Sequence, residues 1–111
     1  MRLEEQTQGA VTILKIVGPL TGDEARAFGT RINDIRQRTM GRYVLEATDL
    51  SFTDSIGLEI LADASEQLVK CGRIFKICNA NDTLKEVFDL TGLRDSFEHY
   101  DDLTAAVRSF L

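Results

Sequence analysis

Three consecutive polar residues, Thr53-Asp54-Ser55, lie between a strand-like run and a helix-like run in the stretch SFTDSIGLEIL, residues 51–61. Each of these residue types can accept a hydrogen bond from a free backbone N–H at the start of a helix. One such residue is enough for a cap, and neither Asp54 nor Ser55 has the Glu or Gln of a capping box three positions later. We therefore treat Ser55 as a candidate site of chemistry at its hydroxyl, and as a helix-capping residue.

Gly57 falls inside the first turn of the helix expected after these residues. A glycine there costs about 1 kcal/mol relative to alanine. Its presence predicts that the backbone must lie close to something, either a packed strand or a binding partner.

The sequence offers little for catalysis at Ser55. His99 is the only histidine, so a Ser-His-Asp hydrolase would require it to meet Ser55, yet it falls on the last predicted strand. We interpret His99 as a half-exposed strand residue. DSIGL lacks the first glycine of the GxSxG nucleophile elbow, and neither GxxxxGK nor GxGxxG occurs. We expect no enzymatic activity, no nucleotide site and no cofactor.

Metal binding has two weak candidates. An acidic cluster surrounds the histidine: Asp95, Glu98, Asp101 and Asp102. Asp101 and Asp102 are explained by the start of a final helix, where carboxylates interact favourably with the helix dipole. Cys71 and Cys78 match no zinc or redox spacing, and we interpret both as small apolar residues. We expect no metal site.

Length and charge limit the classes of function. The chain has 111 residues, which predicts one domain, and a net charge of −5. The acidic balance argues against nucleic acid or an anionic membrane as the main partner. The densest basic group is interpreted as a solvated helix face: Arg31, Arg36, Arg38 and Arg42.

The start of the chain, MRLEEQTQG, has no apolar region of the kind found in a signal peptide. No apolar run approaches the about 18 residues that span a bilayer. We expect a cytoplasmic protein without membrane insertion. Its oligomeric state is left open.

Strand-like and helix-like segments alternate along the chain. The predicted strands cover residues 3–8, 10–18, 42–47, 73–78 and 96–100. Helices are predicted from near Gly22 to Met40, after residues 53–55 to Gly72, from Thr83 to Gly92, and over 103–110. The order β-β-α-β-α-β-α-β-α predicts a single α/β domain with a mixed, mostly parallel sheet and about four α-helices. In such sheets, sites favour the carboxyl ends of strands, and residues 53–55 fall at such an end.

Local signals refine the helix ends. Thr21 with Glu24 and Thr83 with Glu86 match the capping box, so we predict both threonines as side-chain caps. At the other end, Gly92 predicts a Schellman close in which the next residue, Leu93, packs near Phe88.

The order of elements, with LEATDLSFTDSIGLEIL (residues 45–61) and VFDLTGL (residues 87–93), resembles the STAS domain family. Within that family it is most similar to single-domain bacterial anti-sigma factor antagonists. These typically carry a D-L-S-F-x-D-S-x-G turn and later an F-x-x-x-G-L helix end, matched here by Phe88, Gly92 and Leu93. The resemblance spans nearly the whole chain and implies one STAS domain over residues 1–111.

The resemblance implies a phosphorylation switch. The serine after the Asp of that turn, Ser55 here, is phosphorylated in such antagonists by a partner anti-sigma factor that is a serine kinase. The unphosphorylated form would bind the anti-sigma factor and free a sigma factor, and a serine phosphatase would restore it. Partner-binding residues implied in this way are Thr21, Thr53, Asp54, Ser55, Ile56 and Gly57.

The chain departs from the family pattern at two positions. Ile56 occupies a site that is usually Ser, Ala or Thr, and Thr21 replaces the Asp of a G-x-L-D turn. A bulky residue at position 56 suits a permanent interface. The alternative interpretation is therefore a STAS-type accessory subunit of an ABC lipid transporter, or of another assembly, without a phosphorylation switch.

Overall fold

A long hairpin opens the fold of the computed structural model, which describes residues 1–111. β1 (Arg2–Gln8) pairs antiparallel with β2 (Val11–Leu20) through a turn at Gly9, whose φ is +61°. β1 is exposed along nearly its whole length because it forms the edge of the sheet. Five of the ten residues of β2 are buried and the other five are half-buried, in keeping with its run of β-branched residues.

The strands beyond β2 in this sheet run parallel to it, each paired with the one before. β3 (Tyr43–Glu46), β5 (Phe75–Cys78) and β6 (Phe97–Tyr100) complete the order β1-β2-β3-β5-β6. Leu14 pairs with Leu45, and Leu45 pairs with Ile77, so buried side chains line up across the sheet. The α-helices are α1 (Gly22–Thr39), α2 (Ser55–Lys70), α3 (Asp82–Leu90) and α4 (Leu103–Arg108). The predicted α/β domain with a mixed, mostly parallel sheet is confirmed.

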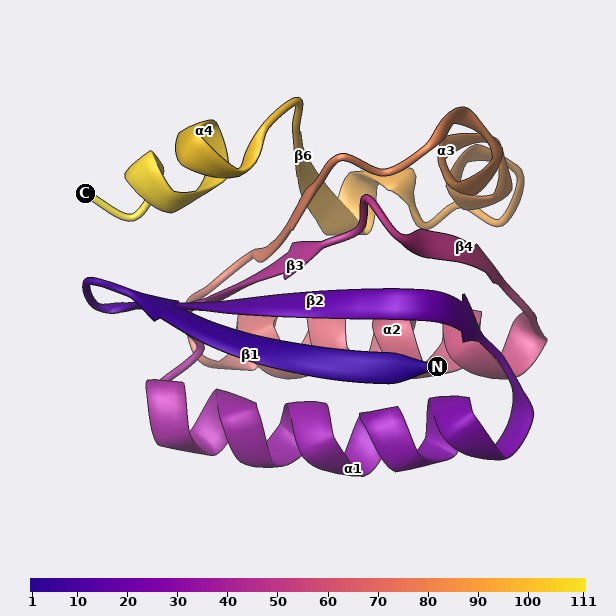
Figure 1. Cartoon of the computed structure of the whole chain (residues 1–111), viewed down its shortest axis with the longest axis horizontal. Helices are drawn as coiled ribbons and strands as arrows, with labels where there is room; N and C mark the ends of the chain where they lie inside the picture. The colour runs from indigo at the N-terminus through magenta and orange to yellow at the C-terminus, as the bar shows by residue number, and fades with distance from the viewer.

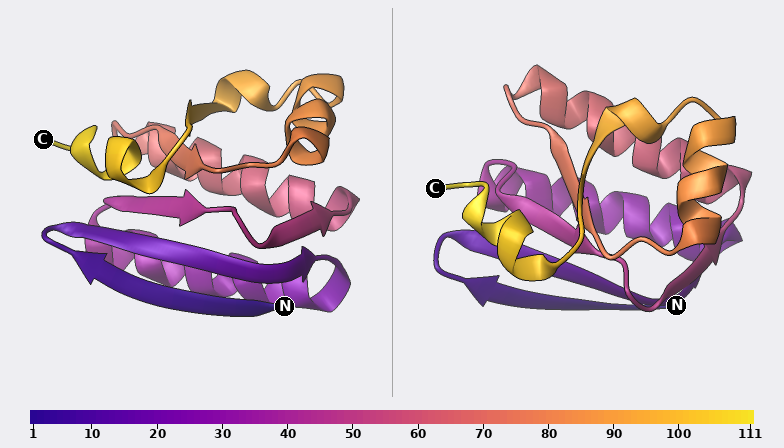
Figure 2. Two further views of the ribbon diagram at one scale, coloured as in Figure 1. Left: turned by 45° about the horizontal axis from the view of Figure 1, so that its top comes forward. Right: turned by 90° about the horizontal axis from the view of Figure 1, so that it is seen from above.

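The helices cover the sheet unequally. α1 and α2 run side by side along one face (Figure 1), and their buried hydrophobic residues belong to a core cluster of 20 residues. α3 contributes Leu84 and Phe88 to the same cluster. α4 covers the opposite face, where Ala106 packs with Val11, Val44 and Cys78 (Figure 2). Cys78 is thus a buried apolar residue as expected, and Cys71 is exposed; both are free thiols.

One strand was not predicted. β4 (Leu50–Thr53) forms between β3 and α2 and pairs with the end of β2, at Gly18 and Leu20. β2 therefore continues through Pro19 to Leu20, beyond its predicted end at Gly18. Only Leu50 of β4 is fully buried, which leaves no clear alternation for sequence reasoning to detect. Thr53 is consequently the last residue of this short strand, and Asp54 and Ser55 follow it and not the central strand β3.

Both predicted capping boxes are wrong. Thr21 occupies the N-cap position of α1 but makes no side-chain cap hydrogen bond. α3 begins at Asp82, and its cap is Asn81, two residues before the predicted cap Thr83; the Asn81 side chain accepts from the Leu84 N–H at 2.8 Å. Asparagine is preferred to threonine at the N-cap position, so the helix starts after Asn81 and not after Thr83.

The predicted Schellman close of α3 is confirmed. The Leu93 N–H donates to the Phe88 carbonyl at 2.9 Å, and Gly92 has a φ of +75°. α2 ends in the same way at Gly72, also predicted as a left-handed cap, whose φ is +74°. These closes depend on residues adjacent in sequence, which is why a local pattern was sufficient.

The basic group from Arg31 to Arg42, three of whose four arginines lie on α1, is only partly a solvated face. Arg31 and Arg38 both form salt bridges with Glu5 of β1, at 2.7 and 3.2 Å. These bonds hold the pKa of the Glu5 carboxyl below its usual range, the Arg31 hydrogen bond being the main cause.

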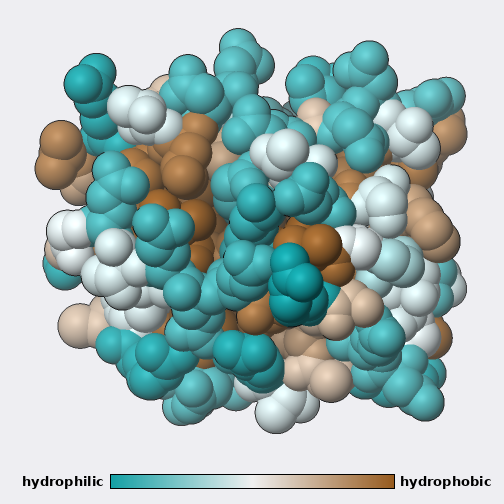
Figure 3. All heavy atoms as spheres, in the orientation of Figure 1, coloured by the Kyte–Doolittle hydropathy of each residue, from teal (hydrophilic) through white to brown (hydrophobic).

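Hydrophilic residues dominate the face seen in Figure 3, around smaller hydrophobic areas. No helix is both long and apolar enough to cross a membrane.

An additional short 3-10 helix, η1 (Arg94–Ser96), precedes β6 and was not predicted. η1 also contacts α2, because the Ser65 hydroxyl donates to the Ser96 carbonyl at 2.8 Å. This bond satisfies one of the few buried polar side chains of the protein.

Candidate functional site

Asp54 links the starts of two helices. It is the N-cap of α2, and its Oδ1 accepts from the Gly57 N–H at 2.9 Å. Its Oδ2 accepts from the N–H of Gly22, the first residue of α1, at 3.0 Å. The Gly57 bond, with that of Gly22, holds the pKa of the Asp54 carboxyl below its usual range. Asp54 therefore carries its charge at neutral pH and supplies the cap that Thr21 does not.

Gly57 is required by a close approach of α2 to the sheet. The Thr53 hydroxyl donates to the Leu20 carbonyl at 2.8 Å, directly beneath the first turn of α2. A Cβ on Gly57 would overlap that hydroxyl and would lie 2.5 Å from the Leu20 carbonyl oxygen. The predicted close backbone approach is confirmed, and a packed strand accounts for it.

Ser55, unlike Thr53 and Asp54, has a side chain that makes no hydrogen bond within the protein. It is the first residue of α2, it is exposed, and its hydroxyl makes no hydrogen bond within the protein. Ile56 is half-buried and packs against the main core. The hydroxyl of Ser55 is thus available for modification without breaking any internal contact.

The residues around Ser55 come from three segments that meet at one end of the sheet. Thr21 is half-buried and adjoins Gly22, which Asp54 holds, so the start of α1 lies beside the start of α2.

Sequence reasoning did not assign Gly22 or Phe52 to this region. Phe52 lies on β4 and is 51% exposed, although aromatic side chains are usually buried. A large exposed apolar residue is a signal that only the structure provides.

The residues that the sequence argued against as catalytic or metal-binding groups have other structural roles. His99 lies on β6, its Nε2 is 3.2 Å from the Arg94 carbonyl, and burial lowers the pKa of its imidazole. Asp102 caps α4, accepting from the Ala105 N–H at 2.7 Å, as its place at a helix start predicted. Glu98 instead pairs with Lys76 at 3.3 Å. The acidic cluster is therefore spread over separate structural roles.

Solved structures share this architecture. An anti-sigma factor antagonist from Mycobacterium paratuberculosis is 23% identical, with 97% of this chain and 92% of that chain covered and a TM-score of 0.83. The phosphorylated form of the Bacillus cell fate determinant SpoIIAA is 17% identical, with 97% and 99% covered and a TM-score of 0.72. The murine anion transporter Slc26a9 matches at 18% identity and a TM-score of 0.78, over 94% of this chain but 18% of the transporter. At these identities the likeness shows a common fold.

The family is settled by sequence. A model of the STAS domain matches residues 2–106, nearly the whole chain, including the turn at Asp54 and both helix ends described above. This chain belongs to the STAS domain family.

Proposed function

We propose that this protein is an anti-sigma factor antagonist whose binding to an anti-sigma factor is controlled by phosphorylation of Ser55. The observation that carries the proposal is the Ser55 hydroxyl, exposed and without an internal hydrogen bond at the start of α2. A kinase can take that hydroxyl as its phosphate acceptor without unfolding the helix. In support, the fold is shared with an anti-sigma factor antagonist and with a phosphorylated SpoIIAA.

A phosphate on Ser55 would leave the fold intact. It adds about 1.5 to 2 negative charges at neutral pH. Near the N-terminus of a helix each negative charge is favourable by roughly 0.3–1 kcal/mol. The switch would therefore act on the surface presented to the partner, and not on the folding of the domain.

At an interface the same charge is unfavourable. Asp54 already places a carboxylate beside Ser55, and no Lys or Arg occurs between Arg42 and Lys70 to pair with a phosphate from within this segment. A desolvated charge without a partner costs several kcal/mol. A cost of about 4 kcal/mol weakens binding roughly a thousandfold.

The partner would be an anti-sigma factor with serine kinase activity, and a serine phosphatase would reverse the modification. The proposed contact surface comprises Thr21, Thr53, Asp54, Ser55, Ile56 and Gly57. Asp54 and Gly57 also have structural roles, so substitutions at Ser55 test binding most cleanly.

The test is a pull-down from the native organism with the wild-type protein, Ser55→Asp and Ser51→Asp, with mass spectrometry of residue 55 in the recovered protein. Ser51 is exposed on β4, so Ser51→Asp adds the same charge nearby as a matched control. We expect phosphate on Ser55 and more than tenfold weaker capture by Ser55→Asp alone. Equal capture by wild type and Ser55→Asp would contradict the switch.

A second candidate is an accessory subunit of an ABC transporter or another assembly, without a switch. The exposed Phe52 and the half-buried Ile56 favour it, because apolar side chains suit a permanent interface. The occurrence of this fold within the Slc26a9 transporter supports such a role. Stable co-purification with an ATPase, unchanged in Ser55→Asp, is the result that would select this candidate.

A further inference from the structure

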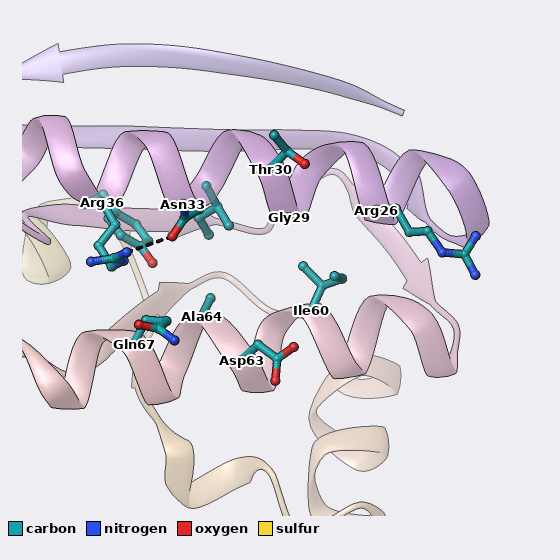
Figure 4. Close-up of a pocket in the computed structure, with 11 residues that line it drawn as sticks. Arg26, Gly29, Thr30, Asn33, Arg36, Ile60, Asp63, Ala64 and Gln67 are labelled. Atoms are coloured by element: carbon teal, nitrogen blue, oxygen red, sulfur yellow. Dashed lines mark hydrogen bonds between the residues drawn. The ribbon is translucent and has the colours of Figure 1, made fainter.

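A groove lies between α1 and α2, away from Ser55. Its volume is about 420 Å³, within the range of small-molecule sites. Figure 4 shows Asn33 and Arg36 of α1 on one wall, facing Ala64 and Gln67 of α2 on the other. Its lining comes from residues 26–36 of α1 and 60–67 of α2, two helices that run side by side (Figure 1), and from Tyr43 of β3.

An unpartnered hydroxyl lines this groove. Tyr43 of β3 is 1% exposed, and its hydroxyl is the one buried side-chain polar atom in the protein without a hydrogen-bond partner. Buried polar groups nearly always have a partner, because leaving one unpaired is unfavourable. A molecule in the groove that accepts a hydrogen bond would satisfy this hydroxyl.

A positive charge lies near the same hydroxyl. Burial raises the pKa of the Tyr43 phenol, and the charge of Arg36 opposes that increase. Arg36 forms no salt bridge; its guanidinium donates to Asn33 Oδ1 at 2.7 Å and makes a 3.7 Å contact with the Cys71 sulfur. Asn33 holds the guanidinium while leaving its charge unpaired, so the groove combines an unpaired cation with an unpaired donor.

The remaining lining limits the charge and shape of a ligand. Ile32, Ile60 and Ala64 provide an apolar strip, in which Ile60 packs directly against Gly29: a Cβ on Gly29 would lie 2.9 Å from the Ile60 Cδ1. Arg26, the other cationic lining residue, is paired with Asp23 in a salt bridge at 2.7 Å. Asp63 lies on the α2 wall, and the whole protein is acidic, with a net charge of −5. Both features disfavour an anion with two or more charges.

We propose that the α1–α2 groove binds a small monocarboxylate with an apolar body. One carboxylate oxygen accepts from the Tyr43 hydroxyl, and the other accepts from the Arg36 guanidinium. The apolar body lies along Ile32, Ile60 and Ala64.

The experiment uses hexanoate as the probe and hexanamide as its neutral counterpart of the same shape. Binding is followed by titration calorimetry and by backbone amide chemical shifts. For a ligand of this size we expect a Kd of about 1 mM for hexanoate, with the shifts confined to α1, α2 and β3. Hexanamide should bind about tenfold more weakly.

Two variants test the two contacts. Tyr43→Phe keeps the ring in the core and removes only the hydroxyl, and Arg36→Gln removes the charge. Each should weaken hexanoate binding about tenfold and bring it close to that of hexanamide. Arg42→Gln is the matched control, because Arg42 is exposed and outside the groove, and it should bind hexanoate like wild type.

Thermal unfolding of the unliganded variants confirms that each is folded. Tyr43→Phe should be at least as stable as wild type, because it removes an unpaired buried group. Equal affinities for hexanoate and hexanamide, unchanged binding in both Tyr43→Phe and Arg36→Gln, or no binding of hexanoate at all would overturn the proposal.

Discussion

The starts of α2 and α4 use the same local pattern but have different neighbours. Asp54 caps α2 and Asp102 caps α4, and each side chain accepts from the N–H three residues later, at 2.9 and 2.7 Å. The third residue is Gly57 in α2 and Ala105 in α4. The start of α4 is complete within its own segment.

The start of α2, in contrast, is part of a larger arrangement. The second oxygen of Asp54 holds Gly22 of α1, and Gly57 lies against Thr53 and the Leu20 carbonyl. A helix cap that can be predicted from sequence can therefore also make a second, long-range hydrogen bond that cannot be predicted. Substitutions at equivalent positions of the two helices should therefore have unequal effects.

The largest effect on stability is expected at Gly57, the third residue after the Asp54 cap. Helix propensity alone predicts that Gly57→Ala would stabilise the protein by about 1 kcal/mol. The overlap with Thr53 and Leu20 predicts the opposite, a loss of about 2–3 kcal/mol in the free energy of unfolding. Urea unfolding measures this difference. The reciprocal control, Ala105→Gly, should cost about 1 kcal/mol; a more stable Gly57→Ala variant would refute the close approach.

The next effect is expected at the caps themselves. Asp102→Ala should lower the free energy of unfolding by about 1 kcal/mol, the usual contribution of an N-cap. Asp54→Ala removes the acceptor for two N–H groups on two helices, so its loss should be about twice as large. Urea unfolding of both variants is the measurement, and equal losses would mean that the Gly22 bond contributes nothing to stability.

A smaller effect is expected from pH. The pKa of Asp54 is lower in the folded than in the unfolded protein, mainly because the Gly57 N–H donates to the ionised carboxylate. Its contribution to stability is complete above the ordinary aspartate pKa of about 3.9 and is lost as pH falls through the lower folded value. Asp54→Asn does not titrate. Its stability deficit relative to wild type, measured by thermal unfolding, should shrink on acidification below about pH 4.

The smallest effect is expected at Ser55. Because its hydroxyl is exposed and makes no internal hydrogen bond, Ser55→Ala should change the free energy of unfolding by less than about 0.5 kcal/mol. Thr53→Ala, which removes the bond to Leu20, should cost more. A large loss in Ser55→Ala would reveal a structural role and would complicate its use in binding experiments.

Sequence reasoning succeeded where the deciding contacts are local. The Schellman close at Gly92 and Leu93 needs only neighbouring residues, and it formed as predicted. The alternation of strands and helices also sufficed for the fold class. Prediction from the sequence failed at Thr21, because the hydrogen bond at that helix start comes from Asp54, far along the chain. It also failed at β4, because that strand forms only where β2 extends beyond β3 to pair with it.

The candidate site was predicted unevenly for the same reason. Gly57 signalled a close approach, but its contacts with Thr53 and Leu20 join separate segments that no local pattern connects. The phosphorylation of Ser55 and the roles of Thr21 and Ile56 in partner binding stay predictions. Testing them requires the partner protein, because an exposed hydroxyl does not by itself show that a kinase or a binding partner recognises it.

The bond from Asp54 to Gly22 also has a consequence for local opening of the protein. The amides of Gly22 and Gly57 belong to different helices, yet one carboxylate protects both from solvent. Fraying of either helix start releases an oxygen of the same side chain. Amide hydrogen exchange at Gly22 and Gly57 should therefore respond together to temperature or denaturant, as one cooperative unit that spans the β2–α1 and β4–α2 turns.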